Sequence, residues 1–509
     1  MTDIILIFEV HQPFRIRRNF FWEHKFFRKT DNKKLFEHYF DINFDRDIFK
    51  RISEKCYLPA NNILLDLIDK FKHEKRKVKV SFSLSGTFLE QCELFNKDVL
   101  ESFKQLAETG CVEFLGQTYY HSLCSLYPSM DEFIEQVKMH KQAIKDLLNF
   151  EPKIFENTEL LYNNRIAKTV ETLNFKGIYA EGVEKLLKGL SPNYVYAAAG
   201  CKNLKVLLRN CRLTDDISFR FSMRSWDQWP LTADKYASWL ASTPGRCISI
   251  FPDYETFGEH HWPETGIHDF LRFLPIEILK WNHLTMATPS EVLAKHKPKG
   301  FIDFEDFKGG VSWADLEKDI SGWLSNSMQW AYYTTIKNLS KLVKESQNLL
   351  FKKIWRLFQV SDHLYYMFTA GGSAGEVHSY FNPYGSPFDA YITCQIAVLD
   401  FEAKLRSYTF AADEPFRFYV DVGDENFTGI EVLSLKGFVQ ALLKVNVKSL
   451  EFHVKRGDFE KWAEFSLHDS FLAEKFKLIS KCKFRGEKLR LKLLRICLKR
   501  LKELSKNFQ

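Results

Sequence analysis

Two short segments of this chain place carboxylates directly after apolar runs. Ser249-Ile250-Phe251-Pro252 leads into Asp253-Tyr254-Glu255-Thr256-Phe257-Gly258-Glu259-His260-His261-Trp262, and Lys153-Ile154-Phe155 leads into Glu156-Asn157-Thr158-Glu159. In α/β folds, functional side chains collect where strands end at their carboxyl termini, because the strand is a rigid support. Acids on two such strand ends predict the carboxylate pair that cleaves a glycosidic bond.

Glu159 is the predicted nucleophile and Asp253 the predicted general acid/base. Hydrolysis with retention needs one carboxylate to attack the anomeric carbon and one carboxylic acid to protonate the leaving oxygen. The surroundings must therefore hold the pKa values of the two groups apart. The alternative is that both are ordinary helix-capping or loop acids, which is the commoner role of a single acid after a strand.

Histidines accompany these segments. His11 follows the first apolar run, His121 lies in a later strand-to-helix loop, and His260 and His261 lie beside Asp253. A divalent metal is one interpretation. Adjacent histidines do not easily face one ion, however, and no H-x-D, H-x-x-x-H or H-E-x-x-H spacing supplies two ligands from one element. Hydrogen bonding to sugar hydroxyls is favoured instead, and we predict no metal and no cofactor.

Several tryptophans lie among polar residues and are candidate platforms for a flat sugar ring. They are Trp226 and Trp229 in Ser225-Trp226-Asp227-Gln228-Trp229, together with Trp262 and Trp313. An aromatic ring stacks on the apolar face of a sugar. Packing in the core is the alternative for each of them.

Short apolar runs alternate with helical patterns up to about residue 290. The strand-like runs are residues 4–10, 78–84, 112–115, 154–155, 177–180 and 247–251. This alternation predicts an α/β domain with a parallel sheet or barrel. One helix between the runs has a predicted capping box at Ser129 and Glu132, a buried face of Phe133, Val137, Ile144 and Leu148, and Pro152 just beyond its end.

The rest of the chain is predicted to be mostly helical. Residues 315–344 and 349–368 are expected to be helices, and a polar break at 411–415 precedes a strand at 416–422. The resulting domains are 1–290 (catalytic), 291–411 (helical) and 412–509 (small and C-terminal). The helix expected at 487–506 has Leu494, Cys497, Leu498, Leu501 and Leu504 on one face. It either packs on its own small domain or lies on a membrane or polyanion.

Composition excludes several classes of protein. A net charge of +7 is small for 509 residues and argues against nucleic acid as a partner. The 10 Cys are scattered singly, which favours a reduced, cytoplasmic location. Residues 3–10 are expected to be a buried strand and not a signal peptide, and no stretch predicts stable membrane insertion. The oligomeric state is not predicted.

Five ordered motifs carry a resemblance to a known family over about residues 1–405. They are His11-Gln12-Pro13, Gly116-Gln117-Thr118-Tyr119-Tyr120-His121, Glu156-Asn157-Thr158-Glu159-Leu160, Asp253-Tyr254-Glu255-Thr256-Phe257-Gly258 and Thr288-Pro289-Ser290-Glu291. Each is weak alone, but the ordered set resembles glycoside hydrolase family 57, and within it the α-amylase-like group. Glu156 departs from the aromatic or small residue usual at its position.

The resemblance implies an incomplete, seven-stranded (β/α) barrel with a helical domain that completes the cleft. It places Glu159 on the family's nucleophile and Asp253 on its acid/base, in agreement with the interpretation from strand ends. His11, His121 and His260 match substrate-contacting positions, and Asp362 and Tyr365 match the helical domain's contribution to the cleft. It also implies a substrate of α-linked glucan.

The predicted function is a retaining α-glucan hydrolase of the α-amylase type that acts on starch, glycogen or maltodextrin. A 4-α-glucanotransferase or a branching enzyme with the same residues is the nearest alternative, because a sugar hydroxyl then replaces water in the second step. Two further alternatives are a metal-dependent deacetylase or mannosidase-like enzyme using His11, His121 and Asp253, and a glycogen-binding protein without turnover.

Overall fold

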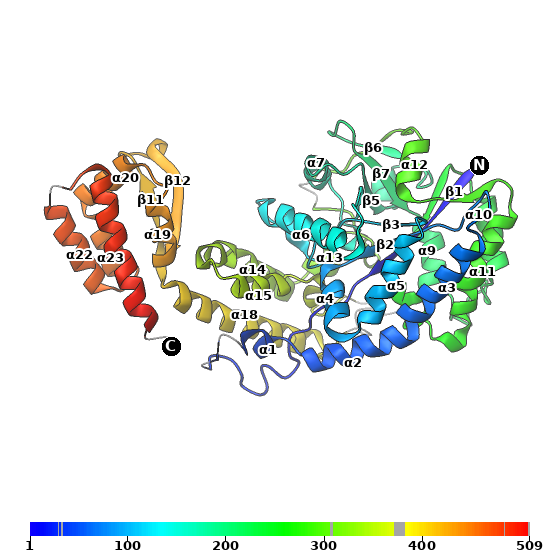
Figure 1. The fold of residues 1–509 in the computed structure, drawn as a ribbon, viewed down its shortest axis with the longest axis horizontal. Helices are drawn as coiled ribbons and strands as arrows, with labels where there is room; N and C mark the ends of the chain where they lie inside the picture. Colours follow the sequence, from blue (N-terminus) through cyan, green and yellow to red (C-terminus); the bar gives the residue numbers. More distant parts are fainter. Residues whose placement is uncertain (29, 32–33, 306–308, 371–381, 483, 507–509) are drawn as a thin grey trace. The chain divides into compact units, whose positions relative to one another are not determined.

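The computed structural model describes residues 1–509 except 29, 32–33, 306–308, 371–381, 483 and 507–509 (Figure 1). The chain divides into two compact units. Unit 1 comprises residues 1–18, 40–331 and 359–391, and unit 2 comprises residues 19–39, 332–358 and 392–509.

Unit 1 is a mixed α/β fold built on a mostly parallel sheet. Its strands are β1 (Thr2–Val10), β2 (Val80–Leu84), β3 (Val112–Phe114), β4 (Ile154–Phe155), β5 (Gly177–Glu181), β6 (Tyr196–Ala198), β7 (Lys205–Arg209), β8 (Cys247–Ile250), β9 (Leu284–Met286) and β10 (Phe301–Ile302). Parallel pairs run in the order β4-β5-β7-β8-β1-β2-β3, and β9 also pairs with β1, whereas β6 and β7 pair antiparallel. A parallel bridge between Gly116 and Phe155 joins the segment after β3 to β4.

The predicted strands are confirmed in unit 1. Strand β1 is apolar along nearly its whole length and buried on both faces, as expected of a parallel strand covered by helices. Strands β6, β7, β9 and β10 were not predicted. Three of them have two or three residues, too few to show a periodic pattern, whereas β7 has five residues, with three apolar residues between Lys205 and Arg209.

The helices of unit 1 alternate with these strands. They are α2 (Ile42–Ile52), α3 (Leu58–Lys70), α4 (Gly86–Phe95), α5 (Lys97–Glu108), α6 (Asp131–Leu148), α7 (Asn164–Thr172), α8 (Glu184–Leu187), α9 (Cys211–Ser218), α10 (Ala233–Ser242), α11 (Ile267–Lys280), α12 (Pro289–Lys295), α13 (Ser321–Leu324) and α16 (Ser361–Tyr365). Polar caps fix several starts: the Ser85 and Asn163 side chains accept backbone N–H groups at the first turns of α4 and α7.

The capping box predicted for α6 was wrong, although its buried face is confirmed. The N-cap residue is Met130, with no side-chain cap, and Ser129 Oγ accepts only the Asp131 N–H, at 3.2 Å. Glu132 instead accepts a hydrogen bond from Gln136 within the buried side of the helix. The capping box of this domain lies at Thr288 and Glu291, at the start of α12.

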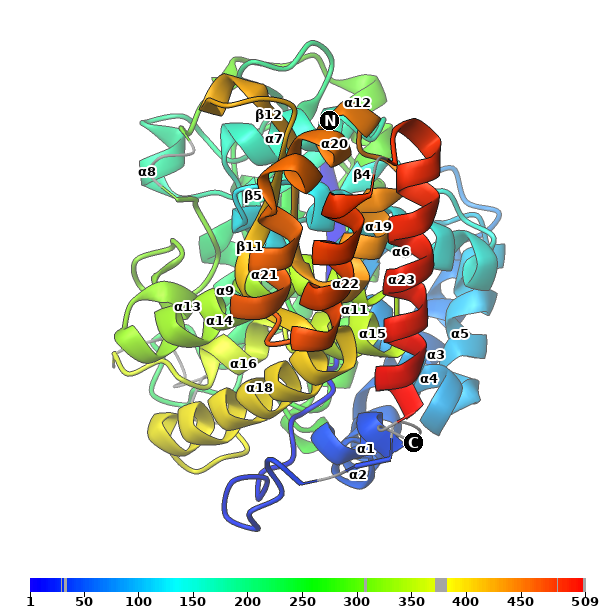
Figure 2. The same cartoon turned by 90° about the vertical axis from the view of Figure 1, so that its left-hand side faces the viewer.

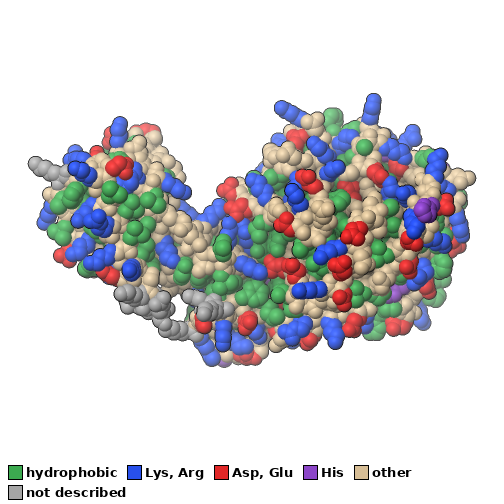
Figure 3. Space-filling model, in the orientation of Figure 1, with side chains coloured by type: hydrophobic (Ala, Val, Ile, Leu, Met, Phe, Trp, Pro, Cys, Tyr) green, Lys and Arg blue, Asp and Glu red, His purple; other side chains and the backbone are tan. Residues whose placement is uncertain are grey.

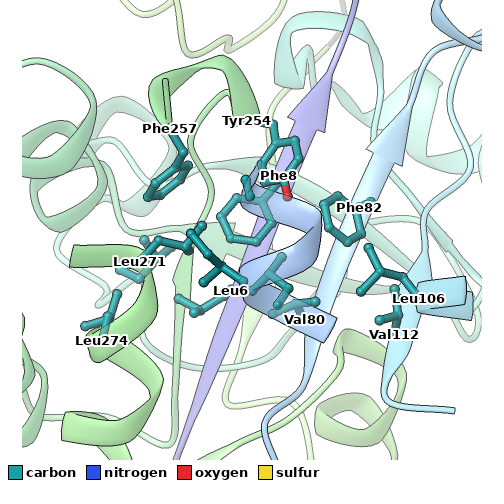
Figure 4. Packing of buried hydrophobic residues seen from close by; sticks show 14 of the residues in the cluster. Leu6, Phe8, Val80, Phe82, Leu106, Val112, Tyr254, Phe257, Leu271 and Leu274 are labelled. Carbon is teal, nitrogen blue, oxygen red and sulfur yellow. The ribbon is translucent and has the colours of Figure 1, made fainter. Parts of the chain in front are cut away.

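A large hydrophobic cluster of unit 1 lies between the sheet and its covering helices. Figure 4 shows Leu6 and Phe8 of β1 beside Phe82 of β2, with Leu106 of α5 and Leu271 of α11 closing over them. Tyr254, which directly follows Asp253, packs its ring 5.0 Å from Phe8. The loop that carries Asp253 is therefore anchored in this core.

Unit 2 combines a two-stranded antiparallel sheet with helices. Its elements are α1 (Leu35–Tyr39), α15 (Leu349–Leu357), β11 (Ala411–Tyr419), β12 (Phe427–Ser434), α19 (Leu435–Leu442), α20 (Val447–Arg456), α21 (Asp458–Phe465), α22 (Ser470–Lys481) and α23 (Gly486–Lys506). Helices α14 (Ser327–Ser346) and α18 (Pro387–Thr409) continue from unit 1 into unit 2. A separate hydrophobic cluster, made entirely of residues after 409, forms the core of the C-terminal part.

Several predictions for this half of the chain were wrong in detail. In place of the single helix expected at 315–344, the structure has the short helix α13, which begins at Ser321, followed by α14. The helix expected at 349–368 is divided into α15 and α16, because Val360 between them forms a β-bridge with Ser122. The polar segment 411–415 is the start of β11. On α23, Leu494 and Cys497 are buried in the local cluster, but Leu498 is 53% exposed. Among the described residues, no helix is long and apolar enough to cross a membrane.

Candidate active site

Glu159 lies just beyond β4 in an unusual backbone conformation. Its φ is 60° and that of Leu160 is 52°, both in the left-handed region that costs non-glycine residues about 1–2 kcal/mol each. The segment 311–313 holds this turn: Ser312 Oγ and the Trp313 N–H both donate to the Glu159 carbonyl, at 2.9 and 3.3 Å. Strain of this kind persists only where the surroundings fix it, and it is typical of functional sites.

Two donors fix the Glu159 carboxylate. Trp313 Nε1 donates to Oε2 at 2.7 Å, and Ser361 Oγ donates to Oε1 at 2.9 Å. The backbone N–H of Ser361 in turn donates to the carbonyl of His121 at 2.9 Å. The arrangement orients Glu159 as a nucleophile would need.

His121 lies against the same carboxylate. Its Nε2 is 3.6 Å from Glu159 Oε1, and its Nδ1 is 3.1 Å from Gln117 Oε1, so that the ring spans the two side chains. Burial alone would lower the pKa of His121, but the contact with Glu159 and the nearby negative charges outweigh it and raise that pKa. The contact with Glu159 therefore favours the cationic form of His121.

His11 and Asp362 complete this side of the site. The His11 ring stacks on His121 with centroids 4.0 Å apart, and its Nε2 is 2.9 Å from Asp362 Oδ2. Burial and the charge of His121 lower the pKa of His11 to about 4. Burial would raise the pKa of Asp362, but its contacts with His11 lower it. A neutral His11 therefore donates from Nε2 to an Asp362 anion, while its Nδ1 accepts from Ser85 Oγ at 2.8 Å.

Asp253 follows β8 and has different surroundings. The backbone of Asp253 forms a parallel β-bridge with Glu9, near the end of β1. No hydrogen bond to the Asp253 carboxyl group is found among the described residues. Burial and the negative charge of Glu159 raise the pKa of Asp253 to about 7, against the opposing charges of Arg209 and His121. A carboxyl group with this pKa carries a proton in a large fraction of molecules at neutral pH, as a general acid requires.

Three further carboxyl groups are buried around this pair. Burial and neighbouring acids raise the pKa of Glu9 well above its usual range. Burial raises the pKa of Glu156 to about 7 and that of Glu255 to about 8. Ser83 Oγ donates to Glu156 at 2.8 Å, and Tyr57 donates to Glu255. The site is thus a buried acidic cluster whose members cannot all be ionised at neutral pH.

Arg209 is the cation that balances part of this charge. It pairs with Glu181 Oε2 at 2.9 Å and Asp215 Oδ1 at 2.6 Å, and its Nε donates to the Phe251 carbonyl two residues before Asp253. It also lies 5.7 Å from the Trp313 ring centroid. Arg209 therefore supports the strand end that carries Asp253.

The other predicted site residues fall into two groups. Tyr365 donates to Asp315 Oδ1 at 3.4 Å, and burial together with the charges of Asp315, Glu159 and Asp253 raises its pKa, so it belongs to the surroundings of both predicted catalytic acids. His260 lies on the loop after Asp253, where burial and His261 lower its pKa to about 3 and keep it neutral.

Trp229 and Trp262 are exposed rings of unit 1. Trp229 is 44% exposed and Trp262 is 56% exposed, with Lys55 Nζ 4.5 Å from the Trp262 centroid. Among the described residues, no hydrogen bond, ion pair or ring contact joins either ring to the acidic cluster. Their roles as platforms stay predictions, whereas Trp226 packs against the core.

Sequence reasoning missed several members of this site. Trp313 was considered only as a platform, and Ser361, Gln117 and Arg209 were not singled out. Glu9 did carry a signal, because an acid inside an otherwise apolar buried strand is costly and is found mainly where it has a function. Within the described part of the chain, no group of three His, Cys, Asp or Glu side chains that could hold a metal ion is found.

A mostly parallel α/β unit with carboxyl groups of contrasting surroundings at its strand ends is the architecture of a glycoside-cleaving enzyme. The model of glycosyl hydrolase family 57 matches residues 5–305, and the chain belongs to this family.

Individual relatives and solved structures are similar to this chain as well. A Methanocaldococcus jannaschii protein named "Putative alpha-amylase" is 47% identical over 407 residues, which is 78% of this chain and 84% of that protein. A Pyrococcus abyssi α-amylase is 22% identical over 50% of this chain but only 38% of its own length. The fold is similar to the crystal structure of a family 57 branching enzyme from Thermococcus kodakaraensis, with a TM-score of 0.55 at 13% identity, over 80% of this chain and 90% of that one.

Proposed function

We propose that this enzyme is a retaining α-glucan hydrolase of the α-amylase type, which cleaves α-1,4 linkages of starch, glycogen or maltodextrin. The observation that supports it most is the contrast between two strand-end acids: Trp313 and Ser361 donate to Glu159, whereas burial raises the pKa of Asp253 to about 7. The relative at 47% identity, with α-amylase in its name, supports the substrate class.

In the first step, Glu159 attacks the anomeric carbon while Asp253 gives its proton to the leaving glycosidic oxygen. The products are a glycosyl ester on Glu159 and a shortened glucan. In the second step the Asp253 carboxylate takes a proton from water, which attacks the same carbon and releases Glu159. Two displacements restore the α configuration. Asp362, Tyr365 and the histidines at 11, 121 and 260 are proposed to bind sugar hydroxyls.

We also propose that the sheet is an incomplete (β/α)7 barrel within residues 1–290. The parallel path from β4 to β3 and the Gly116–Phe155 bridge support this arrangement. The helical domain at 291–411 and the C-terminal domain at 412–509 are proposed boundaries, and the separate hydrophobic cluster after residue 409 supports the second.

The test is to incubate the protein with maltoheptaose in the presence of a chelator and to follow chain lengths and the configuration of new reducing ends by NMR. We expect shorter chains, and we expect each new reducing end to be released in the α configuration. Longer chains without net new ends would reassign the enzyme to glucanotransfer. Activity that disappears with chelator would favour the metal-dependent alternative.

Variants sharpen this experiment. Glu159→Ala is expected to lower turnover by at least about 10⁴-fold with an unchanged melting temperature. Glu108→Ala, at the exposed end of α5, is the matched control and is expected to behave as wild type. A Glu159→Ala protein with near-normal rates would refute the assignment.

A further inference from the structure

The C-terminal segment concentrates positive charge. Residues 470–509 contain 13 of the chain's 72 Lys and Arg residues but three of its 65 Asp and Glu residues. Their net charge of +10 exceeds the +7 of the whole chain, so that residues 1–469 carry −3. The basic character of this protein is therefore local.

Helix α23 presents one outward stripe of basic and apolar side chains. The stripe consists of Lys488, Leu491, Lys492, Arg495, Leu498, Lys499 and Lys502, which are all exposed and recur at steps of three and four residues. Leu491 is 63% exposed and Leu498 is 53% exposed. We call this set the basic stripe. Its opposite face, with Leu489, Leu493 and Cys497, is buried in the local core.

The charges of the basic stripe are largely uncompensated. The acids of α23 are Glu487, which pairs with Arg490, and Glu503, which lies 3.4 Å from Arg500 and 4.0 Å from Lys499. Among the described residues, no ion pair engages Lys488, Arg495 or Lys502. A row of cations without acids on its own helix face favours an anionic partner.

Helix α22 lies beside α23 and has exposed apolar side chains of its own. Phe471 and Leu478 are 42% and 48% exposed and lie seven residues apart, on one face of α22. The Arg500 guanidinium lies 5.0 Å from the Phe471 ring centroid, which joins this face to α23. Figure 2 shows the two helices side by side, and Figure 3 shows Lys and Arg side chains bordering hydrophobic ones on this part of the surface.

The chemistry of this surface selects among partners. An α-glucan is uncharged and gives no reason for a row of cations. A soluble polyanion would pair with the cations but leave the leucines in water. An anionic lipid surface takes both groups, because the apolar side chains enter the boundary of the acyl chains while Lys and Arg reach the headgroups.

We propose that the basic stripe of α23, with Phe471 and Leu478 of α22, is a docking surface for an anionic lipid bilayer. The helix lies in the plane of the interface and does not cross it. This docking would concentrate the enzyme at a membrane surface without involving the acidic cluster of unit 1.

The test is co-sedimentation of the full chain with vesicles of phosphatidylcholine, alone or mixed with phosphatidylglycerol. Binding is expected only to the anionic vesicles and should weaken as salt rises. Lys492→Gln with Arg495→Gln is expected to weaken it about 25-fold, at about fivefold for each cation removed. Leu491→Ser with Leu498→Ser is expected to weaken it about tenfold.

Leu94→Ser with Lys97→Gln in unit 1 is the matched control, since Leu94 is 61% exposed, and it should bind as wild type. Far-UV circular dichroism checks folding of every variant. Absence of binding to anionic vesicles would overturn the proposal. Unchanged vesicle binding by the leucine variant, with equally tight binding of inorganic polyphosphate, would also overturn it and reassign the stripe to a soluble polyanion.

Discussion

Trp313→Phe removes the indole donor from the Glu159 carboxylate and keeps an aromatic ring in its place. The bond is short, at 2.7 Å, and it is one of two that fix this carboxylate. Hydrogen bonds to charged groups contribute about 1.5–3 kcal/mol. If the bond is needed to hold the nucleophile in line with the anomeric carbon, its loss lowers kcat by about 10- to 150-fold.

The assay is single-turnover and steady-state cleavage of maltoheptaose, with thermal unfolding measured in parallel. We expect kcat to fall while KM changes little, because Trp313 acts here on the nucleophile. Trp355→Phe is the matched control: Trp355 is also a hydrogen-bonded indole, but it donates to the Ile336 carbonyl in unit 2 at 2.8 Å. This control should lose stability and keep kcat.

Ser361→Ala removes the second donor and allows a double-mutant cycle. Since both donors hold one carboxylate, the effects of Trp313→Phe and Ser361→Ala should be non-additive. A Trp313→Phe enzyme within threefold of wild-type kcat would refute the reasoning. Equal losses in both tryptophan variants would point to general destabilisation.

Three other perturbations test separate parts of the molecule. The pKa of Asp253 is raised to about 7, and the proposed mechanism needs its acid form, so kcat/KM should fall about tenfold per pH unit above pH 7; a profile flat to pH 9 would contradict this. Gly258→Ala should lower the free energy of unfolding in urea by about 3 kcal/mol or more, because its φ is 138° and a Cβ would lie 1.9 Å from the Lys55 carbonyl oxygen. The control Gly266→Ala has a φ of 84° but open space around its Cβ, and should lower it by about 1 kcal/mol. Equal losses in the two variants would contradict the steric explanation. Glu345→Ala should lower the free energy of unfolding by about 2–3 kcal/mol, because this buried carboxyl group accepts hydrogen bonds from the Leu433 N–H at 2.8 Å and from Ser434 Oγ at 2.5 Å. An unchanged free energy of unfolding would show that these hydrogen bonds do not stabilise the fold.

Sequence reasoning reached the parts of this enzyme that are encoded locally. Strand β1 was predictable because it is a long apolar run, and β4 because an apolar pair between Pro152 and Glu156 marks a buried strand end. The carboxyl ends of parallel strands meet at one edge of a sheet, so that Glu159 and Asp253 were expected near each other from position alone.

The donors that distinguish the two acids were out of reach for the same reasoning. Trp313 is 154 residues from Glu159 along the chain, and Ser361 is 202 residues away. No periodic pattern in either segment reports such a contact. The helix expected at 349–368 even places Ser361 in mid-helix, whereas the structure breaks the helix there and starts α16 at Ser361.

The position of Glu159 therefore depends on more than its strand. A left-handed Glu159 followed by a left-handed Leu160 is unfavourable in isolation, and β4 contributes only two residues to hold it. The Ser312 and Trp313 bonds to the Glu159 carbonyl supply the missing restraint, and the same Trp313 then reaches back to the carboxylate. One loop thus fixes both the backbone and the side chain of Glu159.

Asp253 is anchored through Tyr254 in the core, and within the described part of the chain no donor is found for its carboxyl group, so that burial raises its pKa. The two acids therefore differ because segment 311–313 contacts Glu159 and holds both its backbone and its side chain.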